Sequence, residues 1–421
     1  MKALIKKYKK DLLILSAGNF LKILLTILLT RLATYFLDYE DYANYILIIS
    51  IYNFFSLLLI SPIGPYIIVN STEFLNKNTL YSFYKNLFIK YIIPVSILAG
   101  LSMVFYFLIF ESYVIIYVSA GIIFLLIFKS LFEITNQYFN LFKRNLLYFI
   151  YIISFLLMNI FSGIIFIEFF GNNYLSWFYS FVISNIIISI LVFIKFKKLY
   201  KNKNNKPYSF NKKALNFSLY ILSANIFSWA LYDGSKLIGE NIFQKNDLGV
   251  LLLGFAISAQ IFSTLENFLN QLILPWLYDK ILIFSPKSKF NKFKKYYKTV
   301  FPILLLAFFG SVLFSDLIIY ILVDESKINE GLKIFFIVGL SIEMLKSLIN
   351  TLKNVFFIEL KGWVVSFSNL IGVITFIGLV FCDSEINTYN FSLYILYAYI
   401  ISLIVYISLT IFYQFRWLKH S

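Results

Sequence analysis

Cysteine and histidine are almost absent from this 421-residue sequence, which holds one of each, Cys382 and His420. A single cysteine excludes an internal disulfide and a thiolate metal cluster. A single histidine beside the C-terminus leaves almost no material for a Ser-His-Asp triad or a histidine-bound metal. We therefore predict that the protein carries no cofactor.

Charged residues are also scarce, at 14% of the chain, whereas 60% of the residues are hydrophobic and 20% are aromatic. No soluble domain needs so much apolar surface. The formal net charge of +16 would fit a nucleic-acid partner, but the lysines cluster between long apolar runs, which is typical of a membrane protein. The first apolar run contains Lys22 and Arg31 and is too long for a signal peptide, so we expect a retained first helix.

Twelve apolar runs reach the length of about 20 residues that a transmembrane helix needs. The sequence therefore predicts an all-α integral membrane protein with twelve transmembrane helices. Their approximate cores are 12–36, 43–69, 87–110, 113–139, 146–169, 174–194, 214–239, 248–277, 299–323, 332–357, 362–382 and 391–413.

The distribution of charge predicts the orientation of these helices. If the N-terminus is cytoplasmic, Lys and Arg crowd the inner connecting segments, and the outer segments contain only Lys245 and Lys327. Acidic residues gather in the outer segments instead. This positive-inside pattern indicates a multi-pass protein with both termini in the cytoplasm.

A basic segment at the midpoint predicts the domain organisation. We expect an N-terminal six-helix lobe over residues 1–200, a basic cytoplasmic linker over 201–213 and a C-terminal six-helix lobe over 214–421. Six helices in each half give both halves the same orientation, as in a parallel repeat. Short matches, such as the one between residues 15–19 and 222–225, support this repeat.

Each lobe also carries one polar stripe, which includes the same Lys-Ser-Leu sequence at residues 129–131 and 346–348. On a helix, the members of each stripe lie within about 60 to 80° of one another. A lysine at the bilayer centre costs about 2.5 to 3.5 kcal/mol, so the stripes should face protein or a wet cavity. Neighbouring acids and lysines can neutralise each other, which favours polar packing within each lobe. The stripes are Lys129, Glu133, Asn136 and Asn140, and Glu343, Lys346, Asn350 and Lys353.

Several helix ends and turns resemble those of a known family. Helix 1 opens on Ser-Ala-Gly-Asn at residues 16–19 and carries Arg31 near its outer end, and an acidic turn follows at 38–43. The pattern resembles the polysaccharide-repeat flippases of the O-antigen and capsule type, in the multidrug/oligosaccharidyl-lipid/polysaccharide exporter superfamily. Ala43 stands where that family usually has Gly. Further matching positions are Pro62, Gly64 and Pro65 at the end of helix 2, Asp233 and Lys236 in helix 7, the turn 247–249, and Pro275 at the end of helix 8.

The resemblance implies two pseudo-symmetric six-helix lobes in a V around a central cavity. It implies a flippase, and not an enzyme, that moves undecaprenyl-diphosphate-linked oligosaccharide across the bacterial cytoplasmic membrane by alternating access. Such a transporter serves the biosynthesis of O-antigen lipopolysaccharide or capsule. Besides membrane lipids, a polysaccharide polymerase and a chain-length regulator are candidate partners, and nucleic acid is not expected.

Helix 1 supplies the first candidate site. A diphosphate that crosses hydrocarbon needs fixed cations in a wet pocket. Asn19 and Thr26 lie within about 60° of Lys22, so we predict that Asn19 and Lys22 bind substrate, together with Arg31. The competing interpretations are that Lys22 pairs with an acid of the other lobe and that Arg31 extends to the outer interface.

The C-terminal lobe supplies the remaining candidates. Asp233 and Lys236 lie three residues apart on one face of helix 7 and can pair with each other. Alternatively, Asp233 couples transport to an ion and Lys236 binds cargo, because an intramembrane carboxylate can exchange its cation partner for a proton. Glu266 is a second candidate coupling carboxylate. Lys353 is the least compensated lysine of its stripe and the one most suited to contact a phosphate.

Two other functions stay open at this stage. An integral-membrane polysaccharide polymerase, which is a glycosyltransferase, usually has a large outer loop with catalytic arginines. The longest outer segment here, about 324–331, is short and contains no Arg. A cation-coupled drug or metabolite antiporter of the same superfamily would use a compact cluster of acids and would need fewer cavity cations.

Overall fold

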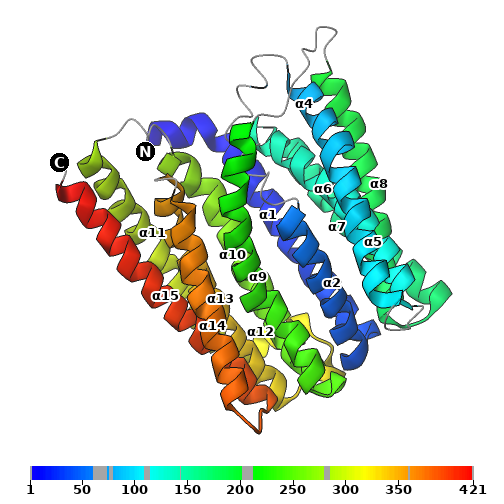
Figure 1. The fold of residues 1–421 in the computed structure, drawn as a ribbon. Coiled ribbons are helices and arrows are strands. Elements are labelled where there is room, and N and C mark those ends of the chain that lie inside the picture. Colours follow the sequence, from blue (N-terminus) through cyan, green and yellow to red (C-terminus); the bar gives the residue numbers. More distant parts are fainter. Residues whose placement is uncertain are drawn as a thin grey trace. The chain divides into compact units, whose positions relative to one another are not determined.

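The computed structural model consists of helices joined by turns, and it describes residues 2–59, 74, 79–108, 114–142, 144–201, 212–278, 285–358 and 361–419 (Figure 1). No strand occurs among these residues. Two compact units, Met1–Leu222 and Ser223–Ser421, make up the chain. The boundary between them lies inside helix α9 (Lys212–Ile242), whereas most of the predicted linker, residues 202–211, lies outside the described residues.

The described residues form twelve long helical segments, one in each predicted run, which confirms the predicted all-α fold. Nine helices in this part of the chain are long and apolar enough to cross a membrane. In the first unit the segments are α1 (Lys2–Phe36), α2 (Tyr39–Leu59), α4 to α5 (Leu80–Leu108), α6 (Val114–Leu141), α7 (Asn145–Phe170) and α8 (Tyr174–Tyr200). They continue with α9, α10 (Lys245–Tyr278), α11 (Pro286–Leu313) with α12 (Ser315–Leu322), α13 (Glu330–Ile358), α14 (Gly362–Cys382) and α15 (Thr388–Lys419).

The structure corrects two predicted helix starts and the continuity of one predicted helix. The third run starts at Leu80, not at 87, and contains a π-helical turn at Phe88–Ile92 between α4 (Leu80–Leu87) and α5 (Ile93–Leu108). The lysine-rich stretch before residue 299, predicted as a loop, is helical from Pro286. The predicted ninth helix is not continuous, because the backbone of Phe314 (φ −100°, ψ 23°) leaves the helical range and separates α11 from α12.

The early start of α11 has a local cause. Ser285 is the N-cap residue, and its hydroxyl accepts a hydrogen bond from the backbone N–H of Ser288. Pro286 follows in the first turn, where a proline loses no helical hydrogen bond. The described residues do not include Pro62, Gly64 and Pro65, so the predicted end of helix 2 lies outside them.

In the first unit, α6 packs against α8, and α1 packs against α7. A Cβ atom at Gly18 of α1 would lie 2.3 Å from the ring of Phe149, so the two helices touch closely there. The Lys129 ammonium of the N-terminal stripe lies 4.5 Å from the ring centre of Tyr52 and 3.9 Å from the Glu133 carboxylate. This polar stripe is thus packed within its own unit.

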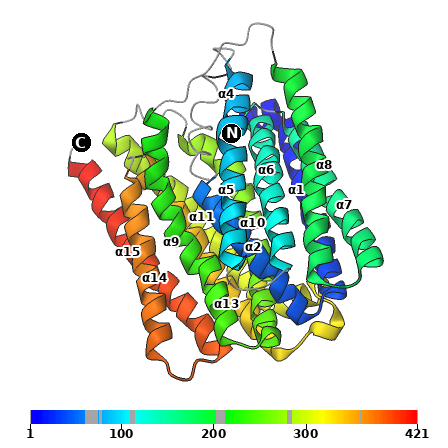
Figure 2. The ribbon, with the colours of Figure 1, turned by 45° about the vertical axis from the view of Figure 1, so that its right-hand side comes forward.

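In the second unit, α13 contacts α10, α11, α14 and α15 and is the central helix of the unit (Figure 2). Its approach to α10 depends on small residues, as is common between membrane helices. A Cβ atom at Gly254 would lie 2.8 Å from the backbone of Phe336, and one at Gly339 would lie 2.7 Å from the Ser258 hydroxyl. That hydroxyl donates to the Phe336 carbonyl at 2.8 Å. The close α10–α13 contact fixes where the polar residues of both helices meet.

Candidate functional site

Helix α9 carries a buried ion pair. Lys236 Nζ lies 2.6 Å from Asp233 Oδ1, one turn apart on the same face. The two residues are only 8% and 6% exposed. A buried charge is tolerated only when it is paired and hydrogen-bonded, so each of these side chains depends on the other.

Helix α13 carries the second pair, formed by Lys346 and Glu343. Lys346 Nζ lies 3.1 Å from Glu343 Oε1, and Glu343 is 3% exposed. Tyr232 of α9 connects the two pairs, because its ring lies 4.2 Å from Lys236 Nζ and 3.7 Å from Lys346 Nζ. One aromatic ring therefore accepts two ammonium groups from different helices, which each stabilise the contact by about 0.5 to 2 kcal/mol.

Glu266 of α10 extends this network toward the end of α13. The Asn350 amide donates to Glu266 Oε1 at 3.0 Å, and the Ser347 hydroxyl donates to Oε2 at 3.3 Å. The Asn350 carbonyl oxygen in turn accepts from Lys353 Nζ at 3.0 Å. Asn350 thus bridges the Lys353 ammonium and the Glu266 carboxylate. The direct hydrogen-bond donors that the structure gives to Glu266 are neutral groups.

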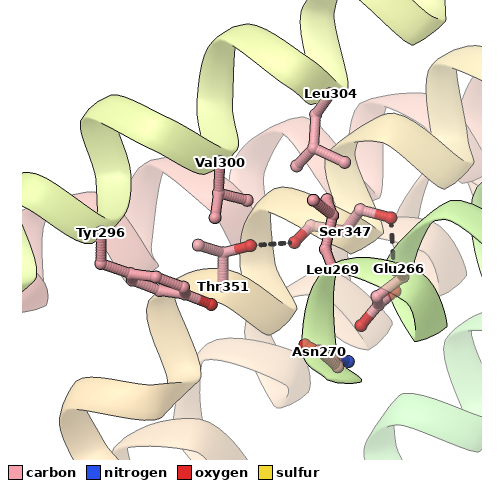
Figure 3. Close-up of a pocket in the computed structure, with 8 residues that line it drawn as sticks. All are labelled: Glu266, Leu269, Asn270, Tyr296, Val300, Leu304, Ser347 and Thr351. Atoms are coloured by element: carbon pink, nitrogen blue, oxygen red, sulfur yellow. Dashed lines mark hydrogen bonds between the residues drawn. The ribbon is translucent and has the colours of Figure 1, made fainter. Parts of the chain in front are cut away.

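A small cavity lies beside Glu266 (Figure 3). It leaves about 10 Å³ for the centre of a water-sized molecule, which corresponds to about one water. Its wall combines three apolar side chains with the polar ends of several others. The lining residues are Glu266, Leu269, Asn270, Tyr296, Val300, Leu304, Ser347 and Thr351.

The network as a whole is electrically balanced among the described residues. It contains three carboxylates and three ammonium groups, supplied by α9, α10 and α13. A balanced network offers no net positive charge to an anionic ligand. It can instead change partners, because each carboxylate that accepts a proton or a metal cation releases the donor that it held.

The predicted residues of α1 lie in the other unit and in a different environment. Asn19 is 7% exposed, and Lys22 and Arg31 are half-buried. The backbone carbonyl of Lys22 accepts from the Thr26 hydroxyl at 2.7 Å. The Lys22 ammonium forms no ion pair with any residue that the structure describes. Lys22 therefore differs from the three lysines of the network, Lys236, Lys346 and Lys353, which lie beside a carboxylate or an amide.

Solved structures with similar folds include MATE transporters. The chain aligns with a Vibrio cholerae MATE transporter at a TM-score of 0.63 and 11% identity, over 99% of this chain and 98% of that one. An outward-facing multidrug resistance MATE family transporter of the MOP superfamily aligns at a TM-score of 0.61 and 13% identity, over 98% of this chain and 97% of that one. An inward-facing structure of such a transporter aligns at a TM-score of 0.59 and 13% identity, over 97% of this chain and 96% of that one. No protein-family model matches the sequence, and no curated protein matches it.

This likeness shows the fold. The chain has the twelve-helix fold of MATE transporters of the MOP superfamily and is a multi-pass membrane protein. The MOP superfamily of these structures is the same superfamily to which the sequence motifs show a resemblance. The polysaccharide-flippase branch within it, the bacterial cytoplasmic membrane and the cytoplasmic termini stay predictions.

The MATE-like fold brings four of the predicted site residues into one network, namely Asp233, Lys236, Glu266 and Lys353. Sequence reasoning did not single out Tyr232 for this site. Its position four residues before Lys236, on the same face of α9, was the available signal. The contacts of Ser347 and Asn350 with Glu266 join two helices that are distant in the sequence, and no local sequence pattern predicts them.

Proposed function

We propose that the chain is an alternating-access transporter in which cation exchange at Glu266 drives the movement of cargo. Glu266 carries this proposal, because neutral amide and hydroxyl donors hold its carboxylate beside a cavity of about one water. A proton or a monovalent metal cation can therefore reach it without first displacing a hydrogen-bonded ammonium group. The fold supports alternating access, because it matches an outward-facing and an inward-facing transporter about equally well.

The cargo that fits this mechanism best is a drug or metabolite exported in exchange for the cation. The fold neighbours are described as multidrug resistance transporters, which favours this class. The balanced charge network favours it as well, because a compact set of acids is what cation coupling requires. On this proposal, Asp233 and Lys236 pair with each other and act as a second exchangeable ion pair.

Transport in proteoliposomes tests this proposal. A proton or sodium gradient should drive the movement of a fluorescent cationic dye, and Glu266→Gln should abolish the gradient-driven part. Asp316→Asn is the matched control, because Asp316 is an exposed acid of the same unit and should leave transport unchanged. Gradient-driven transport by Glu266→Gln at the original rate would reject the coupling role.

Lys22 favours a second candidate function, the flipping of undecaprenyl-diphosphate-linked oligosaccharide. Its ammonium has no carboxylate partner among the described residues, and a half-buried cation of this kind suits a diphosphate. It would repel a cationic drug. On this proposal, Asn19 and Arg31 are further cargo contacts on α1, and Lys236 and Lys353 contact cargo in the second unit.

A deletion strain separates the two candidates. If the protein is a flippase, lipid-linked single repeat units should accumulate on the inner face of the membrane, and a Lys22→Ala protein should fail to clear them. Lys90→Ala is the control, because Lys90 is an exposed lysine of the same unit. Normal delivery of repeat units in the deletion strain would exclude the flippase. Delivery without polymerisation would instead indicate a polymerase.

A further inference from the structure

The exposed face of α6 changes sides along the helix. Toward the N-terminal end the exposed side chains are apolar, namely Ile116, Tyr117 and Phe124, which are 44%, 64% and 46% exposed. Toward the C-terminal end, Glu133 and Gln137 are exposed instead. Phe124 and Glu133 are nine residues apart, which at 100° per residue places them on opposite sides of the helix. One end of α6 therefore exposes an apolar face, and the other end exposes a polar face on the opposite side.

Both exposed polar residues lie at a depth where lipid is apolar. The candidate membrane span of this helix is Ile116–Leu141. With the span centred in the bilayer, Glu133 lies roughly 7 Å and Gln137 roughly 13 Å from the midpoint, whereas hydrocarbon extends about 15 Å to each side. Contact of a carboxylate or an amide with hydrocarbon is strongly disfavoured. The α6 polar face, formed by Glu133, Gln137 and the half-buried Asn140, therefore borders water.

The α6 polar face presents a carboxylate in front of an ammonium group. Glu133 pairs with Lys129 over 3.9 Å, and the Glu133 side chain is 57% exposed, against 23% for Lys129. The ammonium lies over two aromatic rings, 4.5 Å from the ring centre of Tyr52 and 5.4 Å from that of Phe181. A ligand that approaches from the water therefore meets the negative group first. The amide of Gln137 lies one helical turn away.

These features define the chemistry of a ligand. We propose that the α6 polar face borders an aqueous part of the transport path and binds an organic cation, with Glu133 as the charged contact and Gln137 as the polar one. One carboxylate and two amides supply fewer oxygens than the roughly six to eight that a metal cation such as Ca²⁺ takes, whereas an organic cation needs no complete shell of oxygen ligands. The inference rests on the proposed function, because it gives the cargo of the antiporter a binding surface in the first unit.

Thiol labelling in nanodiscs tests the proposal, because both sides of the membrane are then accessible and lipid still surrounds the protein. The background is Cys382→Ser, which removes the exposed native thiol. Gln137→Cys should react readily with a cationic trimethylammonium-ethyl methanethiosulfonate. Phe124→Cys should react about tenfold more slowly or less, because only the thiolate is reactive and apolar surroundings disfavour it.

The charge of Glu133 is isolated by comparing the cationic reagent with its anionic sulfonatoethyl analogue. Residues one turn apart are separated by about 6 Å, so at low ionic strength the carboxylate should favour the cationic reagent at Gln137→Cys about tenfold. Adding Glu133→Gln should remove this preference. Adding Glu168→Gln is the matched control, because it removes an exposed acid at the far end of α7 and should leave the preference unchanged. Millimolar tetraethylammonium should slow the cationic labelling more than sodium chloride of the same concentration.

Three results would overturn the site. Equally slow labelling of Gln137→Cys and Phe124→Cys would place the polar face in lipid. An unchanged reagent preference with Glu133→Gln would mean that the carboxylate attracts no cation. Equal effects of tetraethylammonium and sodium chloride would mean that the face is wet but binds no organic cation.

Two features of the design keep these results unambiguous. Phe124→Cys combined with Glu133→Gln should stay slow to label, which shows that the change of charge did not unfold α6. Labelling is measured without an ion gradient, whereas the coupling role of Glu266 is measured with one. The α6 site and the coupling role can therefore fail independently of each other.

Discussion

Removal of the Lys236 ammonium is the sharpest test of the charge network. In Lys236→Met, a side chain of similar length leaves the Asp233 carboxylate without the ammonium that lies 2.6 Å away. Both side chains are about nine-tenths buried. Breaking a buried pair in this way costs about 3 to 5 kcal/mol. For a unit of this size, that loss lowers Tm by roughly 6 to 20 °C, at about 2 to 4 °C per kcal/mol.

The assay is thermal unfolding in detergent, followed as the fraction of protein that stays monodisperse in size-exclusion chromatography. The double variant Asp233→Asn/Lys236→Met removes both charges and should recover most of the lost Tm, because replacing a whole buried pair is often close to neutral. Lys333→Met is the control. It breaks a pair of the same residue types at 2.7 Å, but the side chains of Lys333 and Asp316 are 44% and 79% exposed. Such a pair contributes about 0 to 1 kcal/mol.

Two results would refute this reasoning. If the double variant is as unstable as Lys236→Met, the loss comes from packing and not from an unpaired charge. If Lys333→Met loses as much as Lys236→Met, burial does not decide the strength of these pairs.

Three further predictions concern the second unit. Glu266→Gln should keep Tm within a few degrees, because the glutamine oxygen can still accept from the Asn350 amide and the glutamine NH2 can donate to the Ser347 hydroxyl, so a loss of transport by this variant would be functional. Gly254→Ala should lower Tm, because its Cβ would lie 2.8 Å from α13, whereas Gly310→Ala has nothing within 4 Å and should be neutral or slightly stabilising. The Tyr394 hydroxyl and then the Glu385 N–H donate to Asp383 and lower the pKa of that carboxyl. A carboxyl with a lowered pKa stabilises the fold at pH values above the ordinary pKa of Asp, and this stabilisation is lost as the pH falls and the carboxyl is protonated. Tyr394→Phe should therefore lower Tm at pH 7, and the difference in Tm should disappear in acid.

The helices of this fold are predictable because each apolar run is long enough to cross a bilayer. The interruptions within these helices are harder to predict. The break at Phe314 has no glycine or proline at the site, so no local residue marks it. The π-helical turn at Phe88–Ile92 does have a local signal, because Pro94 lacks the N–H that a regular helix would give to the Lys90 carbonyl. The early start of α11 was predictable in principle, since Ser285 and Pro286 form a good helix beginning. The high lysine content of the following turns had favoured a loop.

In the candidate site, contacts within one helix can be predicted from the sequence, whereas contacts between helices cannot. The pairs of Asp233 with Lys236 and of Glu343 with Lys346 lie one turn apart, so their spacing alone indicates them. The contact of Lys346 with Tyr232 and the contacts of Glu266 join residues from different helices. The contacts of Glu266 depend on the close approach of α10 to α13 at Gly254 and Gly339, which the sequence does not specify without knowledge of the packing.

The two Lys-Ser-Leu sequences now distinguish the halves of the chain. Lys129 and Lys346 each lie over a tyrosine ring, at 4.5 Å and 3.7 Å. The carboxylate beside Lys129 is 3.9 Å away and largely exposed, whereas Glu343 is buried and 3.1 Å from Lys346. Among the described residues, only the second stripe continues, through Ser347 and Asn350, to a carboxylate on another helix. The duplicated sequence therefore belongs to a connected ion network in one unit and to a local polar contact in the other.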